Sequence, residues 1–294
     1  MKIRVCGSAN IDDTYQVPHF VREGETLAST AYTRNAGGKG LNQAIALSRA
    51  GAQVSFAGAV GRDGQFLAEE LEKNGVDISR LLVREEAIGH AIIQVDREGR
   101  NAILLYGGAN RSFREEDIPQ LLEGVEEGDW LLLQNEISQL GAIAREAKKR
   151  GMQIVLNPSP MEEHLRSLLP LVDWLMLNEV EGSDLTGKQE PEDILDALLE
   201  KYPHLHIVLT LGEKGSVYAD SASRETQDAV PVTAVDTTAA GDTYTGYFLS
   251  AVLRGLSVSG AMAMASCAAA MAVQHPGAVA SIPELAAVLE ALRP

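Results

Sequence analysis

The chain has 294 residues, of which 45% are hydrophobic, and its formal net charge at pH 7 is −16. This length and apolar content predict a globular protein with a large buried core, in one large α/β domain or two smaller ones. The negative charge argues against a nucleic-acid backbone or an anionic membrane as the main partner, but helix N-termini and single lysines can still hold phosphates.

The chain contains two cysteines, Cys6 and Cys267, which lie far apart among apolar or small residues. We expect reduced, buried thiols in a cytoplasmic protein rather than a disulfide. No zinc-ligand spacing occurs, and no long apolar run predicts a signal peptide or a membrane span.

The first apolar strand, residues 3–6, is followed by a loop that carries Asn10 and Asp12. Residues two apart on an extended backbone face the same side. An amide and a carboxylate placed in this way can bind neighbouring sugar hydroxyls. The same residue types are also common in turns, which is the more frequent explanation for the pair taken alone.

Residues 13–34 are extended and polar, and residues 89–106 form two apolar runs around a turn at 96–99. Neither segment can build its own core, so we expect a small sheet that needs a partner surface. Between them, a turn with the sequence GGKG starts at Gly37 and runs into a helix that ends at Gly51. The turn lacks the residues of a Walker A loop, and as a bare pattern it fits any tight turn.

The middle of the chain alternates apolar strands, at 130–134, 154–156, 174–177 and 207–209, with helices, which predicts a parallel sheet. Polar residues follow each strand, among them Glu136, Asn157, Asn178 and Thr210. In open α/β sheets the ligand crevice lies at the carboxyl ends of the strands. We therefore expect these residues to converge on one edge of the sheet.

Residues 235–248 read VDTTAAGDTYTGYF and predict a helix that buries one face and ends at Gly255. Ala239, Ala240 and Gly241 carry no bulk, so their amides could approach an anion at the positive end of the helix. Asp242, in the first turn, could accept a proton from a hydroxyl held beside a phosphate. A base next to an anion site suggests phosphoryl transfer, although an Asp there often only complements the helix dipole. The Ala- and Met-rich stretch at 259–271 is expected to be core.

Taken in order from Asn10 to Gly277, the motifs resemble those of the ribokinase (PfkB) family of carbohydrate kinases. They are NxD, GGKGxNQA, GAN, NxxE, TLGxxG and DTxAAGD. The GAN motif begins at Gly108, and the resemblance implies a turn there whose loop lies close to the substrate. The resemblance implies a three-layer α/β fold with a mostly parallel central sheet, helices on both faces and a small β-sheet lid. It implies a single domain over residues 1–294, with lid strands inserted at about 12–34 and 88–107.

The resemblance also assigns residues to roles. The sugar would be bound by Asn10, Asp12, Gly38, Lys39, Asn42 and Glu136. The nucleotide would be bound by Asn178, Glu181, Thr210, Gly212, Gly215 and Ser266, with Glu181 positioning Mg²⁺ through water. Asp242 would be the base, and the amides of Ala239, Ala240, Gly241 and Asp242 would hold the transferring phosphoryl group. A K⁺ site would involve Asp236, Thr238, Ala272, His275, Gly277 and Ser281.

Two positions depart from the usual family residues. His275 replaces an Arg or Lys near the cation site, and Ser266 replaces a His near the adenine. These changes affect details of the two sites and not the expected chemistry.

The expected activity is ATP-dependent phosphorylation of a sugar hydroxymethyl group, with D-ribose as the first choice because NxD, GGKGxN and Glu136 match the ribose-binding set. The alternatives are deoxyribose, fructose, a ketodeoxy sugar acid or pseudouridine, and a sugar-binding regulatory protein without catalysis. The resemblance further implies ATP and Mg²⁺ as cofactors, K⁺ as an activating ion and a homodimer formed through the lid.

Overall fold

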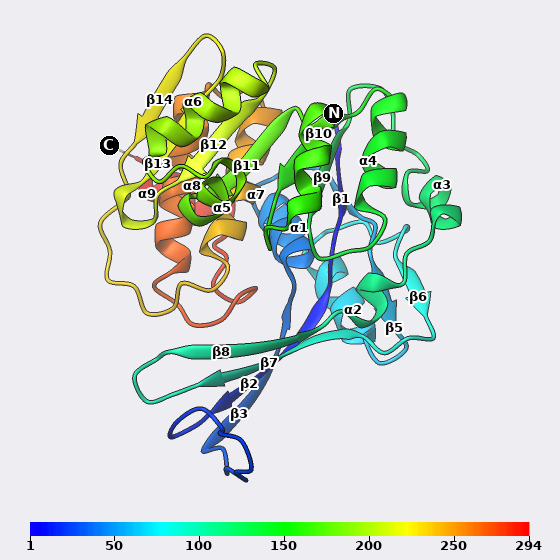
Figure 1. Cartoon of the computed structure of the whole chain (residues 1–294), viewed down its shortest axis with the longest axis vertical. Helices are drawn as coiled ribbons and strands as arrows, with labels where there is room; N and C mark the ends of the chain where they lie inside the picture. The colour runs from blue at the N-terminus through cyan, green and yellow to red at the C-terminus, as the bar shows by residue number, and fades with distance from the viewer. Residues whose placement is uncertain (294) are drawn as a thin grey trace.

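An eight-stranded sheet runs through the centre of the computed structural model, which describes residues 1–293 (Figure 1). The strand order is β14-β13-β12-β11-β10-β9-β1-β4. The strands are β1 (Ile3–Cys6), β4 (Val54–Phe56), β9 (Trp130–Gln134), β10 (Gln153–Asn157), β11 (Trp174–Asn178), β12 (His206–Thr210), β13 (Ser216–Ala219) and β14 (Arg224–Gln227). All neighbours from β4 to β12 pair in parallel, and β13 and β14 complete the sheet as antiparallel strands.

Helices cover both faces of this sheet, which confirms the predicted three-layer fold. Along β11, Trp174 and Met176 belong to one hydrophobic cluster, and Leu175 and Leu177 belong to the other. This alternation is the two-residue period of a strand buried on both faces. The first cluster includes residues of α1 (Lys39–Arg49), α2 (Gln65–Lys73), α7 (Ala240–Leu253), α8 (Val258–Ala272) and α9 (Leu285–Ala291). The second includes residues of α3 (Ile118–Leu121), α4 (Leu140–Lys149), α5 (Glu179–Thr186) and α6 (Pro191–Lys201).

Helix α7 differs from the prediction of one buried face. Every residue from Thr243 to Ala251 is buried, because α7 packs between α1 and α8. A helix enclosed on all sides has no polar face, so periodicity alone could not reveal its environment. Its predicted end is confirmed: the helix stops at Leu253, and Gly255 follows with a φ of 85°.

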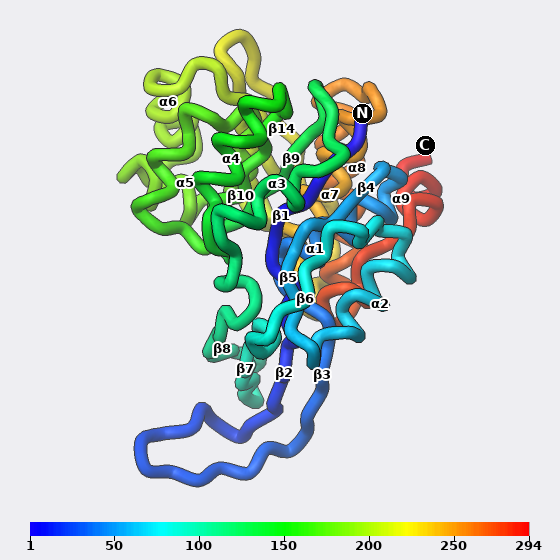
Figure 2. The backbone as a smooth tube through the Cα atoms, turned by 90° about the vertical axis from the view of Figure 1, so that its right-hand side faces the viewer, coloured from blue at the N-terminus to red at the C-terminus, as the bar shows by residue number. Residues whose placement is uncertain are grey.

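A separate four-stranded sheet projects from this body and forms the predicted lid (Figure 1). Its order is β3-β2-β7-β8, with β2 (Asn10–Gln16), β3 (Ala31–Gly37), β7 (Gly89–Val95) and β8 (Asn101–Tyr106). The long segment between β2 and β3 extends beyond the sheet (Figure 2). The prediction of a loop at Asn10 and Asp12 was wrong. Both residues belong to β2, because Asn10 pairs with Gly37 on one side and with Gly89 on the other.

The remaining elements are short. A two-stranded sheet joins β5 (Ala59–Gly61) to β6 (Leu82–Arg84), and the predicted turn at Gly108 is a 3₁₀ helix, Gly108–Arg111. Across residues 1–293, the structure contains no helix whose length and apolar character would let it cross a membrane.

Candidate active site

Two adjoining cavities lie where strands β11 and β12 end. The smaller, of about 160 Å³, is lined by Lys39, Asp242, Asn178 and Glu181 among others. The larger, of about 570 Å³, extends away from it along α8 and the segment 229–234 that follows β14. The two share four lining residues, namely Thr210, Thr237, Ala240 and Gly241. They therefore form one continuous cleft.

Helix α7 begins at this cleft with an uncommon backbone turn. Its N-cap residue, Ala239, has a φ of 59°, in the left-handed region that residues with a Cβ seldom occupy. Among residues 1–293, the amides of Gly241 and Asp242 have no protein acceptor, whereas the Ala240 amide donates to the Thr237 carbonyl oxygen. A Cβ at Gly241 would meet no atom within 4 Å. An anion therefore has room to reach free amides at the positive end of the helix.

The Asp242 carboxylate is held by two neighbouring amide side chains of α1. Asn42 Nδ2 donates to Oδ2 at 3.0 Å, and Gln43 Nε2 donates to Oδ1 at 2.8 Å. Each carboxylate oxygen keeps a further acceptor direction. The group can thus accept a hydroxyl proton in the smaller cavity, as a general base requires.

The close approach of α1 and α7 makes these contacts possible. A Cβ on Gly246 would lie 2.4 Å from the Ala46 Cβ and 2.8 Å from the Leu47 backbone nitrogen. Only glycine lets the two helices lie so near to each other. The spacing of the helices thus depends on a residue one turn beyond Asp242.

The residues predicted to bind a sugar gather around β2 and the start of α1. Asn10 and Asp12 share one face of β2, as the strand period requires. Glu136 accepts a hydrogen bond from the Lys39 backbone N–H at 3.1 Å and another from the Ser8 hydroxyl. The Lys39 ammonium lies 4.0 Å from Glu136 Oε1. These side chains form one polar cluster between the lid and Asp242.

Glycine at position 38 and an amide at position 110 shape this cluster. Gly38 has a φ of 94°, and a Cβ there would lie 3.0 Å from the Asn10 backbone nitrogen. Asn110 Nδ2 donates to Asn10 Oδ1 at 2.7 Å, so the Asn10 side chain is fixed and its own Nδ2 stays available as a donor. The GAN turn predicted near the substrate therefore contacts the predicted sugar-binding pair.

The charges of the cluster influence one another. Burial, assisted by Glu136, Asp13 and Asp242, raises the pKa of Asp12 to about 7. Burial alone would lower the pKa of the Lys39 ammonium, but Asp242, Glu136 and other nearby carboxylates raise it above its ordinary value. Lys39 is therefore a permanent positive charge between the sugar side and the phosphate side of the cleft.

Asn178 and Glu181 cap helix α5 at the far side of the smaller cavity. Asn178 Oδ1 accepts from the Glu181 amide at 2.9 Å, and Glu181 Oε2 accepts from the Asn178 amide at 3.0 Å. The two residues therefore cap the helix, and this structural role is compatible with the predicted binding of a nucleotide. Glu181 is only 7% exposed, and burial raises its pKa despite the bond from the Asn178 amide. A side-chain hydrogen bond from Ser159 also acts to lower the pKa of Glu181, and both Asn178 and Glu181 line the smaller cavity.

The larger cavity is mainly apolar and suits a flat aromatic ring. Its walls include Val230, Pro231, Val232 and Tyr244. Four of the six positions predicted to bind the nucleotide line it, namely Thr210, Gly212, Gly215 and Ser266. The stretch 259–271, expected to be core, is therefore both core and cavity wall, because Ser266 and its neighbours 269 and 270 face the cavity.

Three of the six residues predicted around a monovalent cation are joined by hydrogen bonds. Asp236 Oδ2 accepts from the Gly277 amide at 2.8 Å, and Oδ1 accepts from the Thr238 amide at 2.9 Å and hydroxyl at 2.6 Å. Burial acts to raise the pKa of Asp236, but these bonds outweigh it and hold the pKa below its usual range. The other three make local bonds within the end of α8 and the loop after it: Ala272, His275 and Ser281.

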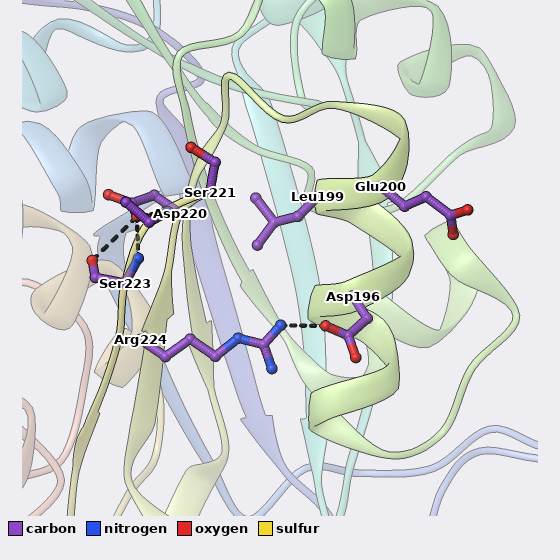
Figure 3. Close-up of a pocket in the computed structure, with 8 residues that line it drawn as sticks. Asp196, Leu199, Glu200, Asp220, Ser221, Ser223 and Arg224 are labelled. Atoms are coloured by element: carbon purple, nitrogen blue, oxygen red, sulfur yellow. Dashed lines mark hydrogen bonds and ion pairs between the residues drawn. The ribbon is translucent and has the colours of Figure 1, made fainter.

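A further depression of about 470 Å³ lies between α6 and the strands β13 and β14 (Figure 3). Arg224 crosses it to pair with Asp196 and Glu192, while Asp220 accepts bonds from Ser223. It contains none of the predicted site residues. We therefore assign the candidate site to the cleft at Asp242.

Sequence reasoning missed several parts of the cleft. Gln43 was part of the GGKGxNQA motif but was assigned no role. Its partner Gln134 ends β9 two residues before Glu136, and it was assigned no role either. The apolar stretch of Val230, Pro231 and Val232 lies outside any helix or strand. A run of apolar residues with no predicted element to bury it was the available signal.

Comparisons with known proteins agree with this geometry. The family model described as pfkB family carbohydrate kinase matches residues 1–285. The chain is 35% identical to a ribokinase of Haemophilus influenzae over 301 residues, covering 99% of this chain and 98% of that protein. A ribokinase structure from Cryptococcus neoformans in complex with ADP is 36% identical, with a TM-score of 0.85 and 99% of both chains covered. A ribokinase structure from Arabidopsis thaliana with ribose and ATP is 32% identical, with a TM-score of 0.87, covering 98% of this chain and 97% of that one.

Proposed function

The chain belongs to the pfkB family of carbohydrate kinases and is a sugar kinase. We propose that it transfers the γ-phosphoryl group of ATP to the 5-hydroxymethyl group of D-ribose. The observation that carries the proposal is the position of Asp242. Its carboxylate lies between a cluster of hydroxyl-binding side chains and a helix N-terminus with free amides. A base and an anion site that share one cavity are what phosphoryl transfer to an alcohol requires.

The sugar side of the cleft would bind and orient ribose. Asn10, Asp12 and Glu136 offer donors and acceptors for its ring hydroxyls, and Gly38 lets the backbone approach the ring. The Asn42 Oδ1 atom is buried and has no partner within the described chain, so a hydroxyl there would satisfy it. These contacts would place the 5-hydroxyl beside Asp242.

The nucleotide would occupy the larger cavity, with its base among Val230, Val232 and Tyr244 and its phosphates directed toward Asp242. The 5-hydroxyl oxygen attacks the γ-phosphorus while the bond to the β–γ bridging oxygen breaks and ADP leaves. The hydroxyl proton passes to Asp242. The free amides of Gly241 and Asp242, with the Lys39 ammonium, stabilise the charge on the transferring group. Without the base, turnover should fall by about a hundredfold or more.

Two kinds of ion complete the proposal. Mg²⁺ would be held by the phosphate oxygens and, through water, by the Glu181 carboxylate, and it would neutralise phosphate charge. No group of three or more His, Cys, Asp or Glu side chains in the described part of the chain suits a metal ion, which fits an ion that arrives with the nucleotide. K⁺ would bind where the segment of Asp236 and Thr238, before α7, meets the segment of Gly277, after α8.

We further propose that the chain is one kinase domain with the lid inserted, and that two copies join through their lids in the cytoplasm. Strand β8 is exposed along its whole length, and Leu104, Leu105 and Tyr106 are large apolar residues with 48–68% exposure. An open sheet edge of this kind favours pairing with another chain. The two cysteines are free and buried, which suits a reducing compartment. A monomeric mass in solution at assay concentrations would contradict the dimer.

The test is ADP release from MgATP with a panel of pentoses, hexoses and nucleosides, with and without K⁺, beside Asp242→Asn. The highest rate with ribose, abolished in the variant, supports the proposal. A higher rate with deoxyribose, fructose, a ketodeoxy sugar acid or pseudouridine keeps the chemistry and refutes ribose. Ribose binding without turnover of any sugar would favour the regulatory alternative.

A further inference from the structure

Resting on the proposed role of Asp242 as base, we propose that Gln43 is a positioning residue that aims the Asp242 carboxylate at the sugar hydroxyl. It is held in turn by Gln134 and Asn157. None of the three was predicted to bind a substrate. Together they form a chain of amides behind the base, in which Gln43 and Gln134 are buried and Asn157 is half-buried.

The hydrogen bonds of this chain run in one direction. Gln43 Nε2 donates to Asp242 Oδ1 at 2.8 Å and to Asn157 Oδ1 at 3.0 Å. Gln134 Nε2 donates to Gln43 Oε1 at 2.6 Å, and Asn157 Nδ2 donates to the Met176 carbonyl at 2.9 Å. The fixed Met176 carbonyl orients Asn157, and Asn157 with Gln134 orients Gln43. Rotation of the Gln43 amide by half a turn would place its oxygen against two oxygen acceptors and lose all three of its bonds.

Two members of the chain, Gln43 and Gln134, lie apart from the proposed substrate contacts, whereas Asn157 is half-buried and lines the smaller cavity. Gln43 and Gln134 are fully buried, and they come from α1 and from β9 in the central sheet. The other side chain that holds Asp242 is Asn42, which we assign also to the sugar. The bond from Gln43 is thus the side-chain contact of Asp242 that does not change when the sugar arrives.

The cost of the arrangement argues for a role beyond stability. Within residues 1–293, the buried Gln134 Oε1 atom has no hydrogen-bond partner, and a Cβ added to Gly7 would lie only 2.3 Å from it. Burying an unpaired amide oxygen is unfavourable, and an apolar side chain of similar size would avoid it. The chain also holds Asp242 in place against the repulsion of Asp12 and Glu181 and the attraction of Lys39, the charges that face it.

Gln43→Met keeps the size of the side chain and removes its hydrogen bonds, so it tests the proposal. The kcat should fall by about tenfold to a hundredfold, because a base about 1 Å out of place loses that much rate. The KM values for ribose and ATP should stay within about twofold, because no substrate contact is removed. Gln134→Met should lower kcat by a smaller factor in the same way.

A double variant distinguishes positioning from general damage. In the Asp242→Asn background, followed with radiolabelled ATP, Gln43→Met should cause no further loss, because its effect passes through Asp242. The matched control is Ser250→Ala, which removes another buried bond between α7 and α1, from Ser250 Oγ to the Ala50 carbonyl. It should lower the melting temperature and leave kcat unchanged.

Unchanged kcat in a folded Gln43→Met protein, or an equal loss in the Asp242→Asn background, overturns the proposal. If Gln43→Met does not fold by circular dichroism, Gln134→Met decides by the same two criteria. Full activity of Asp242→Asn itself would instead overturn the proposed function, whatever Gln43 does.

Discussion

Replacing Gly246 with alanine tests whether the spacing of α1 and α7 controls the active site. Two effects oppose each other in this variant. Alanine has a higher helix propensity than glycine, worth about 1 kcal/mol in a helix interior. The new Cβ, however, would lie 2.4 Å from the Ala46 Cβ and 2.8 Å from the Leu47 backbone nitrogen. Neither neighbour can rotate away, so the two helices must separate.

Overpacking of a buried helix contact typically costs about 1–3 kcal/mol, and contacts this short place the cost near the upper end. After the gain in propensity, we expect the free energy of unfolding to fall by about 1–2 kcal/mol. Separation of the helices also lengthens the bonds from Asn42 and Gln43 to Asp242. The kcat should therefore fall as well, by about tenfold or more.

Urea unfolding and steady-state kinetics measure both effects. The control is Gly260→Ala in α8, where the nearest atom to a new Cβ is Ser257 Oγ at 3.4 Å, an ordinary contact. That variant should be as active as the parent and at least as stable, because it gains helix propensity without a clash. A Gly246→Ala protein that is more stable than the parent and has the same kcat would refute the reasoning.

Four further predictions concern the ionisable groups of the cleft. Burial and neighbouring carboxylates raise the pKa of Asp12 to about 7. Because the ionised carboxylate accepts more hydrogen bonds, the KM for ribose should fall as the pH rises from 6 to 8. In Asp12→Asn the KM for ribose should not vary over this pH range. The same raised pKa means that the free energy of unfolding of the sugar-free protein should fall as the pH rises from about 3.8 through about 7. Denaturation curves of Asp12→Asn should not show this loss. Glu181→Gln keeps the cap on α5, so melting should be unchanged while the Mg²⁺ concentration for half-maximal rate rises about tenfold. Asp236→Ala should remove stimulation by K⁺ in a salt titration of the rate, whereas equal stimulation would reject the cation site.

Most of the parallel part of the central sheet could be predicted from the sequence, whereas the two antiparallel strands β13 and β14 were not predicted. The predicted strand 130–134 is β9, and the predicted strands 154–156, 174–177 and 207–209 are each one residue shorter at one or both ends than β10, β11 and β12. Strands buried on both faces are continuous apolar runs bounded by polar residues, which few other elements imitate. The polar residues at their ends then lie at one edge, because the strands are parallel.

The lid and the cleft walls were harder to predict because their residues do not carry such a pattern. Asn10 and Asp12 look like turn residues, and only pairing with β3 and β7 makes them a strand. Val230 and Val232 make an apolar wall without belonging to any helix or strand. In both cases a partner distant in sequence decides the local structure, and periodicity does not contain that information.

Gln43 shows why the residues behind a base are the least visible in a sequence. On α1 it is a polar residue beside Asn42, and nothing local shows that its side chain is buried. Its burial depends on which helix packs against α1. The helix that packs against α1 here is α7, and Gly246 of α7 permits the close approach. As a result, Gln43 Nε2 lies 2.8 Å from Oδ1 of Asp242, which is 199 residues away in the sequence. Motifs identify the residues predicted to contact substrates, because polar side chains there stand next to glycine-rich turns in the sequence. The contact that holds Asp242 depends instead on the packing of two helices, so Gly246→Ala and Gln43→Met disturb the same bond, one through the backbone and the other through the side chain.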